Sequence, residues 1–154
     1  MERTVCITGA TSGIGRATAL LLGSKSCRII ACGRRSERLQ ELSDLLGERV
    51  HTLAFDVRDR KAVEAAFESL PGAFRDVDVL INNAGNAHGL DLIQDGDPDD
   101  WDAMIDIIVK GLLYVTKTLL PSLLRSKHPQ ILNIGSTAGK EVYPRGNVYC
   151  ASKH

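Results

Sequence analysis

The chain has 154 residues, of which 44% are hydrophobic and 25% are charged, a composition typical of one globular domain with a hydrophobic core. Lys and Arg together number 19, as do Asp and Glu, so the formal net charge at pH 7 is zero. Broad electrostatic capture of nucleic acid or of an anionic membrane surface needs a basic excess, so we expect neither as a partner.

Short apolar runs alternate with segments of helical periodicity along the whole chain. We expect strands at residues 4–8, 27–32, 50–55, 77–81 and 131–134. We expect helices at residues 14–22, 36–46 with Ser36 as cap, 61–70 and about 101–124, and the start of another near Asn147. This alternation predicts an α/β fold over residues 1–154. The expected architecture is a single Rossmann-like domain, a doubly wound parallel sheet in three layers, α/β/α.

Residues 95–100 are acidic and separate the fourth strand from the long helix. They superficially resemble a calcium loop, but the sixth position is not a glycine and Pro98 interrupts the pattern. We interpret Asp97 as the N-cap of the long helix and Pro98 as its first residue. The apolar stripe of this helix predicts core or a subunit interface; it consists of Ile105, Ile108, Leu112, Val115, Leu119 and Leu123.

The four cysteines form no CxxC pair and do not cluster with histidines at zinc spacing, so we expect no metal site. Three of them lie in apolar runs, where free cysteine behaves as a small buried side chain, and this favours a reduced, cytoplasmic setting. Residues 1–3 lead directly into an apolar strand, so no signal peptide is expected. Lys110, Lys117 and Pro121 interrupt the apolar stretch at 105–124, which we do not expect to span a membrane.

A glycine turn separates the first strand from the first helix, with the sequence Thr8-Gly9-Ala10-Thr11-Ser12-Gly13-Ile14-Gly15. Glycines at such a turn let the backbone approach a phosphate, and the free N–H groups at the start of a helix attract the anion. A plain strand-to-helix turn explains two of the three glycines. Their position after the first strand of a βαβ unit nevertheless favours a dinucleotide site.

The second strand is followed by Gly33-Arg34-Arg35, with no carboxylate before Glu37. Sites for NAD usually place an acidic residue here to hold the 2′-hydroxyl of the ribose, whereas an arginine accommodates a 2′-phosphate. Two adjacent arginines are also common as a solvated surface pair. At this position they predict NADP as the cofactor rather than NAD.

Five ordered motifs resemble those of the short-chain dehydrogenase/reductase family. They are the glycine turn at residues 8–15, Asp56-Val57, Asn82-Asn83-Ala84-Gly85, Ser136, and Tyr149-Cys150-Ala151-Ser152-Lys153. Residues 133–139 and 146–149 most resemble NADP-dependent 3-hydroxy acid dehydrogenases of the serine type. The resemblance implies an oxidoreductase that transfers a hydride between NADP(H) and a secondary alcohol or carbonyl, such as a 3-hydroxy acid. It also implies a homo-oligomer, either a dimer or a tetramer.

The resemblance implies roles for the residues that match the family motifs. Cofactor contacts are implied for Gly9, Thr11, Ser12, Gly13, Ile14, Gly15, Arg34, Arg35, Asp56, Val57, Asn83, Ala84, Gly85, Tyr149 and Lys153. Catalytic roles are implied for Ser136, Tyr149 and Lys153. Tyr149 and Lys153 are four residues apart and share one face of a helix, and a lysine cation beside a phenol favours the phenolate. We therefore expect Tyr149 to move the substrate proton and Ser136 to hydrogen-bond the reacting oxygen.

Two features depart from the family pattern. The long helix of the family carries an asparagine that supports a proton relay to the lysine, and Ile108 occupies that position with no side-chain donor or acceptor. Members of the family are also longer, so the resemblance implies that the C-terminal part is missing and that the domain ends at the start of the Tyr–Lys helix. Both departures leave open a non-catalytic dinucleotide-binding protein or a truncated inactive fragment. A structural interaction module is a third alternative.

Overall fold

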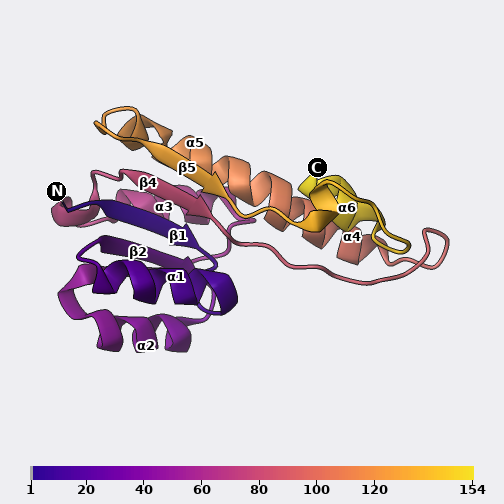
Figure 1. Ribbon diagram of the computed structural model, residues 1–154, viewed down its shortest axis with the longest axis horizontal. Coiled ribbons are helices and arrows are strands. Elements are labelled where there is room, and N and C mark those ends of the chain that lie inside the picture. The colour runs from indigo at the N-terminus through magenta and orange to yellow at the C-terminus, as the bar shows by residue number, and fades with distance from the viewer. Residues whose placement is uncertain (1) are drawn as a thin grey trace.

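The computed structural model describes residues 2–154, which contain one sheet of five strands. The strands are β1 (Thr4–Thr8), β2 (Arg28–Gly33), β3 (Val50–Ala54), β4 (Val79–Asn82) and β5 (Gln130–Asn133). Their spatial order is β3-β2-β1-β4-β5, and every neighbouring pair runs parallel (Figure 1). The order of strands reverses between β1 and β4, and open α/β sheets bind ligands at the carboxyl ends of the strands at such a point.

Helices cover both faces of this sheet. α1 (Gly13–Ser24) and α2 (Ser36–Leu46) cover one face, and α3 (Arg60–Glu68) and α5 (Leu112–Leu123) cover the other (Figure 1). The side chains of β1 alternate between the two layers, because Val5 and Ile7 pack in the core under α1 and α2, whereas Cys6 packs in the core under α3 and α5. The predicted three-layer α/β fold is confirmed.

One continuous helical run follows the acidic turn. It consists of α4 (Pro98–Met104), a π-helical segment (Ile105–Gly111) and α5. The Asp97 carboxylate accepts a hydrogen bond from the N–H of Asp99 at 2.9 Å, so Asp97 is the N-cap as predicted, and the helix begins earlier than its apolar periodicity indicates. The π-helical segment is a departure from the predicted regular helix. Within this segment, the consecutive side chains of Ile107 and Ile108 are both buried.

The apolar stripe of the long helix belongs to the core. Its buried members are Ile108, Val115, Leu119 and Leu123, and its other two members are half-buried. Pro121 lies inside the last turn of α5, which ends two residues later. Val115, Leu119 and Leu123 pack against the sheet and α3, whereas Ile108 packs in a separate cluster with Met104 and Ile107.

The limits of several elements differ from the predicted ones. β2 begins one residue later, because the N–H of Cys27 donates to the carbonyl of Leu22 at 3.2 Å and so belongs to the preceding turn. β4 begins two residues later, because the N–H of Val77 donates to the hydroxyl of Ser122 at 2.8 Å. The strands β3 and β5 and the helices α1 and α3 differ from their predicted ranges by no more than two residues at either end.

The prediction that Ser36 caps the second helix is wrong. Arg35 is the N-cap of α2 with an extended backbone, Ser36 is the first helical residue, and no side chain caps the helix. The physical reason lies in the preceding turn, where the guanidinium of Arg35 is held by the hydroxyls of Thr11 and Ser12. The residue at the cap position is therefore held by the glycine turn, through the side chain of Arg35.

The remaining elements are short. Three 3-10 segments follow α2, α3 and β5, namely η1 (Gly47–Arg49), η2 (Gly72–Phe74) and η4 (Thr137–Gly139). The last helix, α6 (Asn147–Lys153), begins where the sequence predicts it. No helix within residues 2–154 is both long and apolar enough to cross a bilayer.

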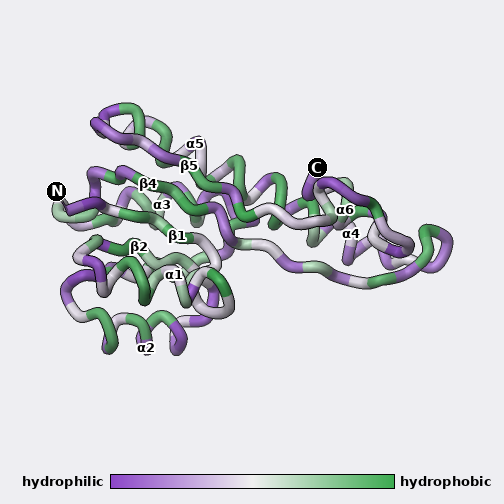
Figure 2. The backbone as a smooth tube through the Cα atoms, viewed as in Figure 1, coloured by the Kyte–Doolittle hydropathy of each residue, from purple (hydrophilic) through white to green (hydrophobic). Residues whose placement is uncertain are grey.

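The edge strand β5 and the segments beyond it are the least covered part of the fold. All four residues of β5 are exposed. Figure 1 shows that α4, α6 and the loops joined to them extend past the carboxyl ends of the strands. Figure 2 shows hydrophobic colour along β1, β2 and β4, and mixed colour in this extension. The main core therefore lies between the sheet and its four covering helices.

Candidate functional site

A cavity of about 640 Å³ opens at the carboxyl ends of the strands. One of its ends is formed by the glycine turn and the residues after β2 and β3, and the other by the residues after β4 and β5 and by α6. Every residue that the sequence assigns to cofactor binding lines this cavity except Gly15. A volume of this size is typical of sites for small molecules and cofactors.

The glycine turn is held in place by the end of β4. The N–H groups of Asn83 and Ala84 each donate to the Thr8 hydroxyl at 3.0 Å. The side-chain amide of Asn83 donates to the carbonyls of Thr8 at 2.9 Å and Gly9 at 3.1 Å. Gly9 has a φ of +65°, and a Cβ there would lie 2.9 Å from this amide nitrogen, so only glycine fits without strain. Asn83 thus lines the cavity and also fixes the turn.

The first N–H groups of α1 are available to an anion in the cavity. Ser12 is the N-cap of α1, but its side chain makes no capping hydrogen bond. Gly13 follows with a φ of +52° and open space where a Cβ would be. Gly15 lies beneath this surface against Asn83 and Gly9, which explains why it does not line the cavity. Helix N-terminal N–H groups without side-chain caps suit a phosphate.

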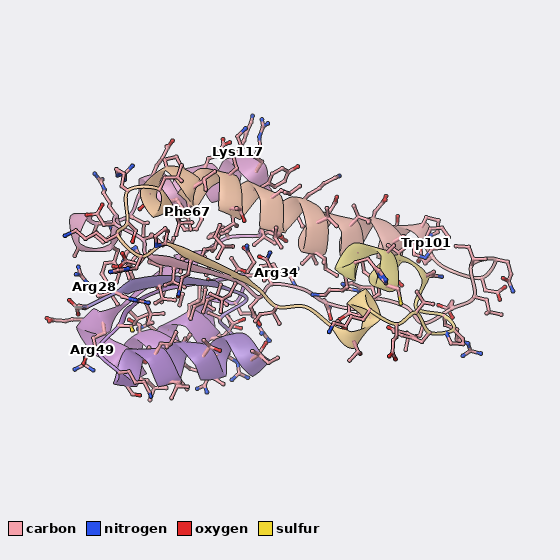
Figure 3. All side chains as sticks on the ribbon, turned by 45° about the horizontal axis from the view of Figure 1, so that its top comes forward. Arg28, Arg34, Arg49, Phe67, Trp101 and Lys117 are labelled. Carbon is pink, nitrogen blue, oxygen red and sulfur yellow. The ribbon has the colours of Figure 1, made fainter. Side chains whose placement is uncertain are left out.

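Two arginines stand beside the glycine turn. The guanidinium of Arg35 donates to the hydroxyls of Thr11 at 2.8 Å and Ser12 at 2.7 Å. Arg34, labelled in Figure 3, has an exposed side chain whose Nη1 lies 3.6 Å from a carboxylate oxygen of Asp56. Both arginines line the cavity, as does the residue before them, Gly33, where a Cβ would collide with Thr11. This end of the cavity therefore carries two cations.

Asp56 is tied to an arginine outside the cavity. Its carboxylate accepts from Nε of Arg58 at 3.0 Å and from Nη2 at 2.7 Å, and also from the backbone N–H of Arg58 at 3.0 Å. Partial burial raises the pKa of Asp56, but the hydrogen bonds and charge of Arg58, together with the charge of Arg34, hold the pKa below its ordinary value. The Asp56 carboxylate is therefore ionised at neutral pH.

Tyr149 and Lys153 line the opposite end of the cavity from adjacent turns of α6. Lys153 Nζ donates to the carbonyl of Ile134 at 3.0 Å and lies 6.0 Å from the centre of the Tyr149 ring. A Cβ on Gly85 would lie 3.5 Å from the same nitrogen. The lysine cation is thus held close to the phenol and to the turn after β4.

Ser136 lies just outside the cavity. Its side chain accepts a hydrogen bond from the N–H of Ala138 at 3.2 Å and caps η4, while the preceding residue, Gly135, lines the cavity wall. Of the three residues for which the sequence predicts a catalytic role, the cavity therefore brings together Tyr149 and Lys153. The hydroxyl of Ser136 accepts this bond through its oxygen, so its hydrogen is available for donation.

Ile108 occupies the π-helical segment below α6. It is 6% exposed and packs with Met104 and Ile107, and this cluster contacts Val148 and Tyr149. The isoleucine side chain therefore fills core space under α6 and brings no polar group to it.

Some lining residues were not predicted from the sequence, namely Gly33, Phe55, Asn86, Ile107, Ile134 and Gly135. Five of these flank a motif residue or lie at the carboxyl end of a strand, and that position is a signal that sequence reasoning can use. Ile107 carries no such signal, because the π-helical turn that exposes it to the cavity is not apparent from the apolar pattern.

Two curated relatives show what this chain is similar to. It is 48% identical over 149 residues to the NADP-dependent 3-hydroxy acid dehydrogenase YdfG of Salmonella typhi, with 97% of this chain and 60% of the relative covered. It is also 48% identical over 156 residues to sulfoacetaldehyde reductase 2 of Chromohalobacter salexigens, with 99% of this chain and 62% of the relative covered. The chain therefore spans about three fifths of the length of these relatives.

A solved structure and a family profile agree with these relatives. The closed form of serine dehydrogenase complexed with NADP+ superimposes with a TM-score of 0.95 at 44% identity, covering 97% of this chain and 60% of that one. The profile of the family described as short chain dehydrogenase matches residues 3–154. From the glycine turn to the Tyr–Lys helix, the chain belongs to the short-chain dehydrogenase family.

Proposed function

We propose that this protein binds NADP(H) in the cavity and serves hydride transfer between that cofactor and a secondary alcohol or carbonyl. A 3-hydroxy acid such as serine is the proposed substrate class. The observation that carries this proposal is the continuity of one cavity from an uncapped helix N-terminus and two arginines to Tyr149 and Lys153. The names of the relatives support the choice of cofactor.

The residues present fit a 2′-phosphorylated dinucleotide. The glycine turn and the first N–H groups of α1 would hold the pyrophosphate, because Gly13 leaves open space beside the backbone there. Arg34 and Arg35 would hold the 2′-phosphate through charge-assisted hydrogen bonds. When bound, the cofactor supplies the nicotinamide that accepts or donates the hydride.

The proton is proposed to move at the other end. Tyr149 would accept the proton of the substrate hydroxyl at its phenolate oxygen during oxidation and return it during reduction. Lys153, whose ammonium donates to the Ile134 carbonyl, lies beside this ring, 6.0 Å from its centre. Ser136 would donate its hydroxyl hydrogen to the reacting oxygen and hold it in line for transfer.

A second candidate is a non-catalytic dinucleotide-binding protein or a truncated inactive fragment. The buried Ile108 favours it, because this position offers no side chain to a proton relay. NADPH titration and a turnover assay with 3-hydroxy acids on the same sample test both candidates. Binding with turnover supports the oxidoreductase, binding without turnover supports the second candidate, and the absence of NADPH binding contradicts both.

We further propose that the protein is a homo-oligomer, a dimer or a tetramer. Leu113 and Leu120 on α5 and Leu124 directly after it are exposed and lie on one side of the helix, where a second copy would cover them. Light scattering on the purified protein tests this assignment, and replacing Leu120 with glutamate is expected to shift the mass toward the monomer. A monomeric mass for the unchanged protein contradicts it.

We propose a cytoplasmic location from the oxidation state of the cysteines. All four are free thiols, and Cys6, Cys32 and Cys150 are buried in apolar surroundings. Thiols kept free in this way suit a reducing compartment. Fractionation of cells that express the protein with a small tag tests this location, and recovery from an oxidising compartment contradicts it.

A further inference from the structure

Among the described residues that line the cavity, Asp56 is the only acidic one. It lies at the end where the proposed 2′-phosphate is expected, 3.6 Å from the guanidinium of Arg34. A carboxylate at this place opposes the binding of a phosphate in two ways, because it repels the anion and because it attracts the cation that is meant to receive it. The cavity therefore needs a way to offset the charge of Asp56.

Arg58 offsets that charge from outside the cavity. It does not line the cavity, yet its guanidinium and its backbone N–H together engage both carboxylate oxygens of Asp56. These bonds use most of the lone pairs of the carboxylate. The contact of Asp56 with Arg34 is longer than a hydrogen bond and remains an ion pair. Arg58 is thus the main partner of Asp56, and Arg34 is a secondary one.

We propose that Arg58 is a positioning residue that sets the preference for a 2′-phosphorylated dinucleotide: it holds and neutralises Asp56, so that the guanidinium of Arg34 stays available to the phosphate. The inference rests on the proposed function, which places the 2′-phosphate beside Arg34. Because Asp56 is ionised at neutral pH, its charge is offset by pairing and not by protonation. Losing Arg58 would leave an unpaired carboxylate next to Arg34.

The effect is expected in the ratio of two affinities and not in binding as a whole. NADH shares every part of NADPH except the 2′-phosphate, so any general damage to the site cancels in the ratio of the two dissociation constants. Replacing Arg58 with glutamine is expected to lower the preference for NADPH by about three- to tenfold, the range for a partly exposed charge acting over a few ångströms. The affinity for NADH is expected to stay within about twofold of the unchanged protein.

The matched control is Arg60→Gln. Arg60 begins α3 two residues after Arg58, and its exposed guanidinium pairs with Glu64 at 3.8 Å, outside the cavity. This variant removes the same charge from the same segment, so it measures only the long-range electrostatic contribution of an arginine to the preference for NADPH. Its preference for NADPH is expected to stay within about twofold of the unchanged protein.

The decisive variant is the pair D56N/R58Q. If Arg58 acts through Asp56, removing the carboxylate as well restores the preference for NADPH, because nothing then competes for Arg34. If the R58Q protein does not fold, D56N/R58Q is compared with D56N alone. D56N/R58Q and D56N are then expected to show the same preference for NADPH, once any change measured in R60Q has been subtracted.

The experiment is a fluorescence titration of the 154-residue protein with NADPH and with NADH at fixed ionic strength. Equal losses of both affinities in R58Q overturn the inference, because Arg58 then only supports the turn. If R58Q selectively loses affinity for NADPH and D56N/R58Q does not restore it, the inference is also overturned, because Arg58 then contacts the phosphate itself. No preference for NADPH in the unchanged protein contradicts the proposed function instead, and the titration of that protein separates this case from the others.

Discussion

The cavity has a proposed nucleotide end, formed by the glycine turn, Arg34, Arg35 and Asp56, and a proposed catalytic end, formed by Gly85, Ile134, Tyr149 and Lys153. At the nucleotide end, the walls are turns that leave the carboxyl ends of β1, β2 and β3 directly. The two residues after β4, Asn83 and Ala84, hold the first of these turns through several hydrogen bonds. At the catalytic end, α6 rests on α4 and the π-helical segment, beyond the exposed strand β5 (Figure 1). The main core supports the first end and a small satellite cluster supports the second.

Because the two ends of the cavity have different supports, we expect cofactor binding and catalysis to respond separately to substitutions. The proposed nucleotide binding would depend on contacts that the sheet fixes, whereas the proposed proton transfer would depend on how α6 is held against residues 104–108. A change at one end is therefore expected to leave the other end's property largely intact. The following predictions test that separation, beginning with the largest effect.

Replacing Tyr149 with phenylalanine removes the proposed acid/base and leaves the rest of the ring in the cavity wall. In protein that turns over substrate, the rate is expected to fall by about 10²- to 10⁴-fold, the usual contribution of general acid–base catalysis. The NADPH affinity is expected to stay within about twofold, since no nucleotide contact of the other end is touched. The control is Tyr143→Phe, which removes a hydroxyl from the loop before α6. Retained turnover in the Tyr149 variant assigns the proton transfer to another group.

Replacing Gly9 with alanine is expected to disrupt the nucleotide end. The φ of +65° disfavours a side chain, and the new Cβ would meet the Asn83 amide and the backbone of Ala84. We expect a loss of about 2–3 kcal/mol in the free energy of unfolding, together with much weaker NADPH binding. Chemical denaturation and titration measure the two effects. Gly72→Ala is the control, because a Cβ at Gly72 meets nothing within 4 Å, and equal effects at both positions contradict the account.

Replacing Ile108 with asparagine tests whether this position lacks a polar side chain for a proton relay or only fills core space. The side chain is buried among Met104, Ile107 and Tyr149, and an unpaired buried amide costs about 1–3 kcal/mol. We expect a lower melting temperature and no gain in rate. Asp102→Asn, which places the same amide at an exposed position of the same helical run, is expected to change the melting temperature little. A faster reaction without loss of stability shows instead that the polar side chain was missing from a relay.

Replacing Arg34 with glutamine alters the choice of cofactor. The exposed guanidinium is free to meet a 2′-phosphate, and losing a charge-assisted contact of this kind is expected to lower the NADPH affinity about tenfold, or about 1.4 kcal/mol. NADH affinity and the unfolding free energy are expected to change little, since the Arg34 side chain is exposed and its ion pair with Asp56 is 3.6 Å long. An equal loss for both cofactors shows that Arg34 supports the site in general.

Much of the fold and of the nucleotide end can be predicted from the sequence. Local signals suffice for the glycine turn and for the arginine pair after β2, because each motif lies where a strand ends and its function depends on the backbone nearby. The alternation of strands and helices likewise predicts the three layers. The Asp97 cap can also be predicted from a local signal, since Pro98 follows it directly.

Other features depend on contacts between distant segments. The π-helical turn at Ile105–Gly111 has the same apolar pattern as a regular helix, so periodicity does not distinguish the two. The capping error at Ser36 arose because Arg35 is held by the glycine turn, more than twenty residues away in sequence. The position of Ser136 outside the cavity depends on its bond to Ala138, which the spacing of the motif does not reveal.

The central claim is that the nucleotide end is built for a 2′-phosphorylated dinucleotide. The most direct test is a titration of the 154-residue protein with NADPH and with NADH at the same ionic strength, followed by fluorescence. The account predicts that NADPH binds at least about tenfold more tightly, because two guanidinium groups stand where the phosphate is expected. Equal affinities, or tighter binding of NADH, contradict it.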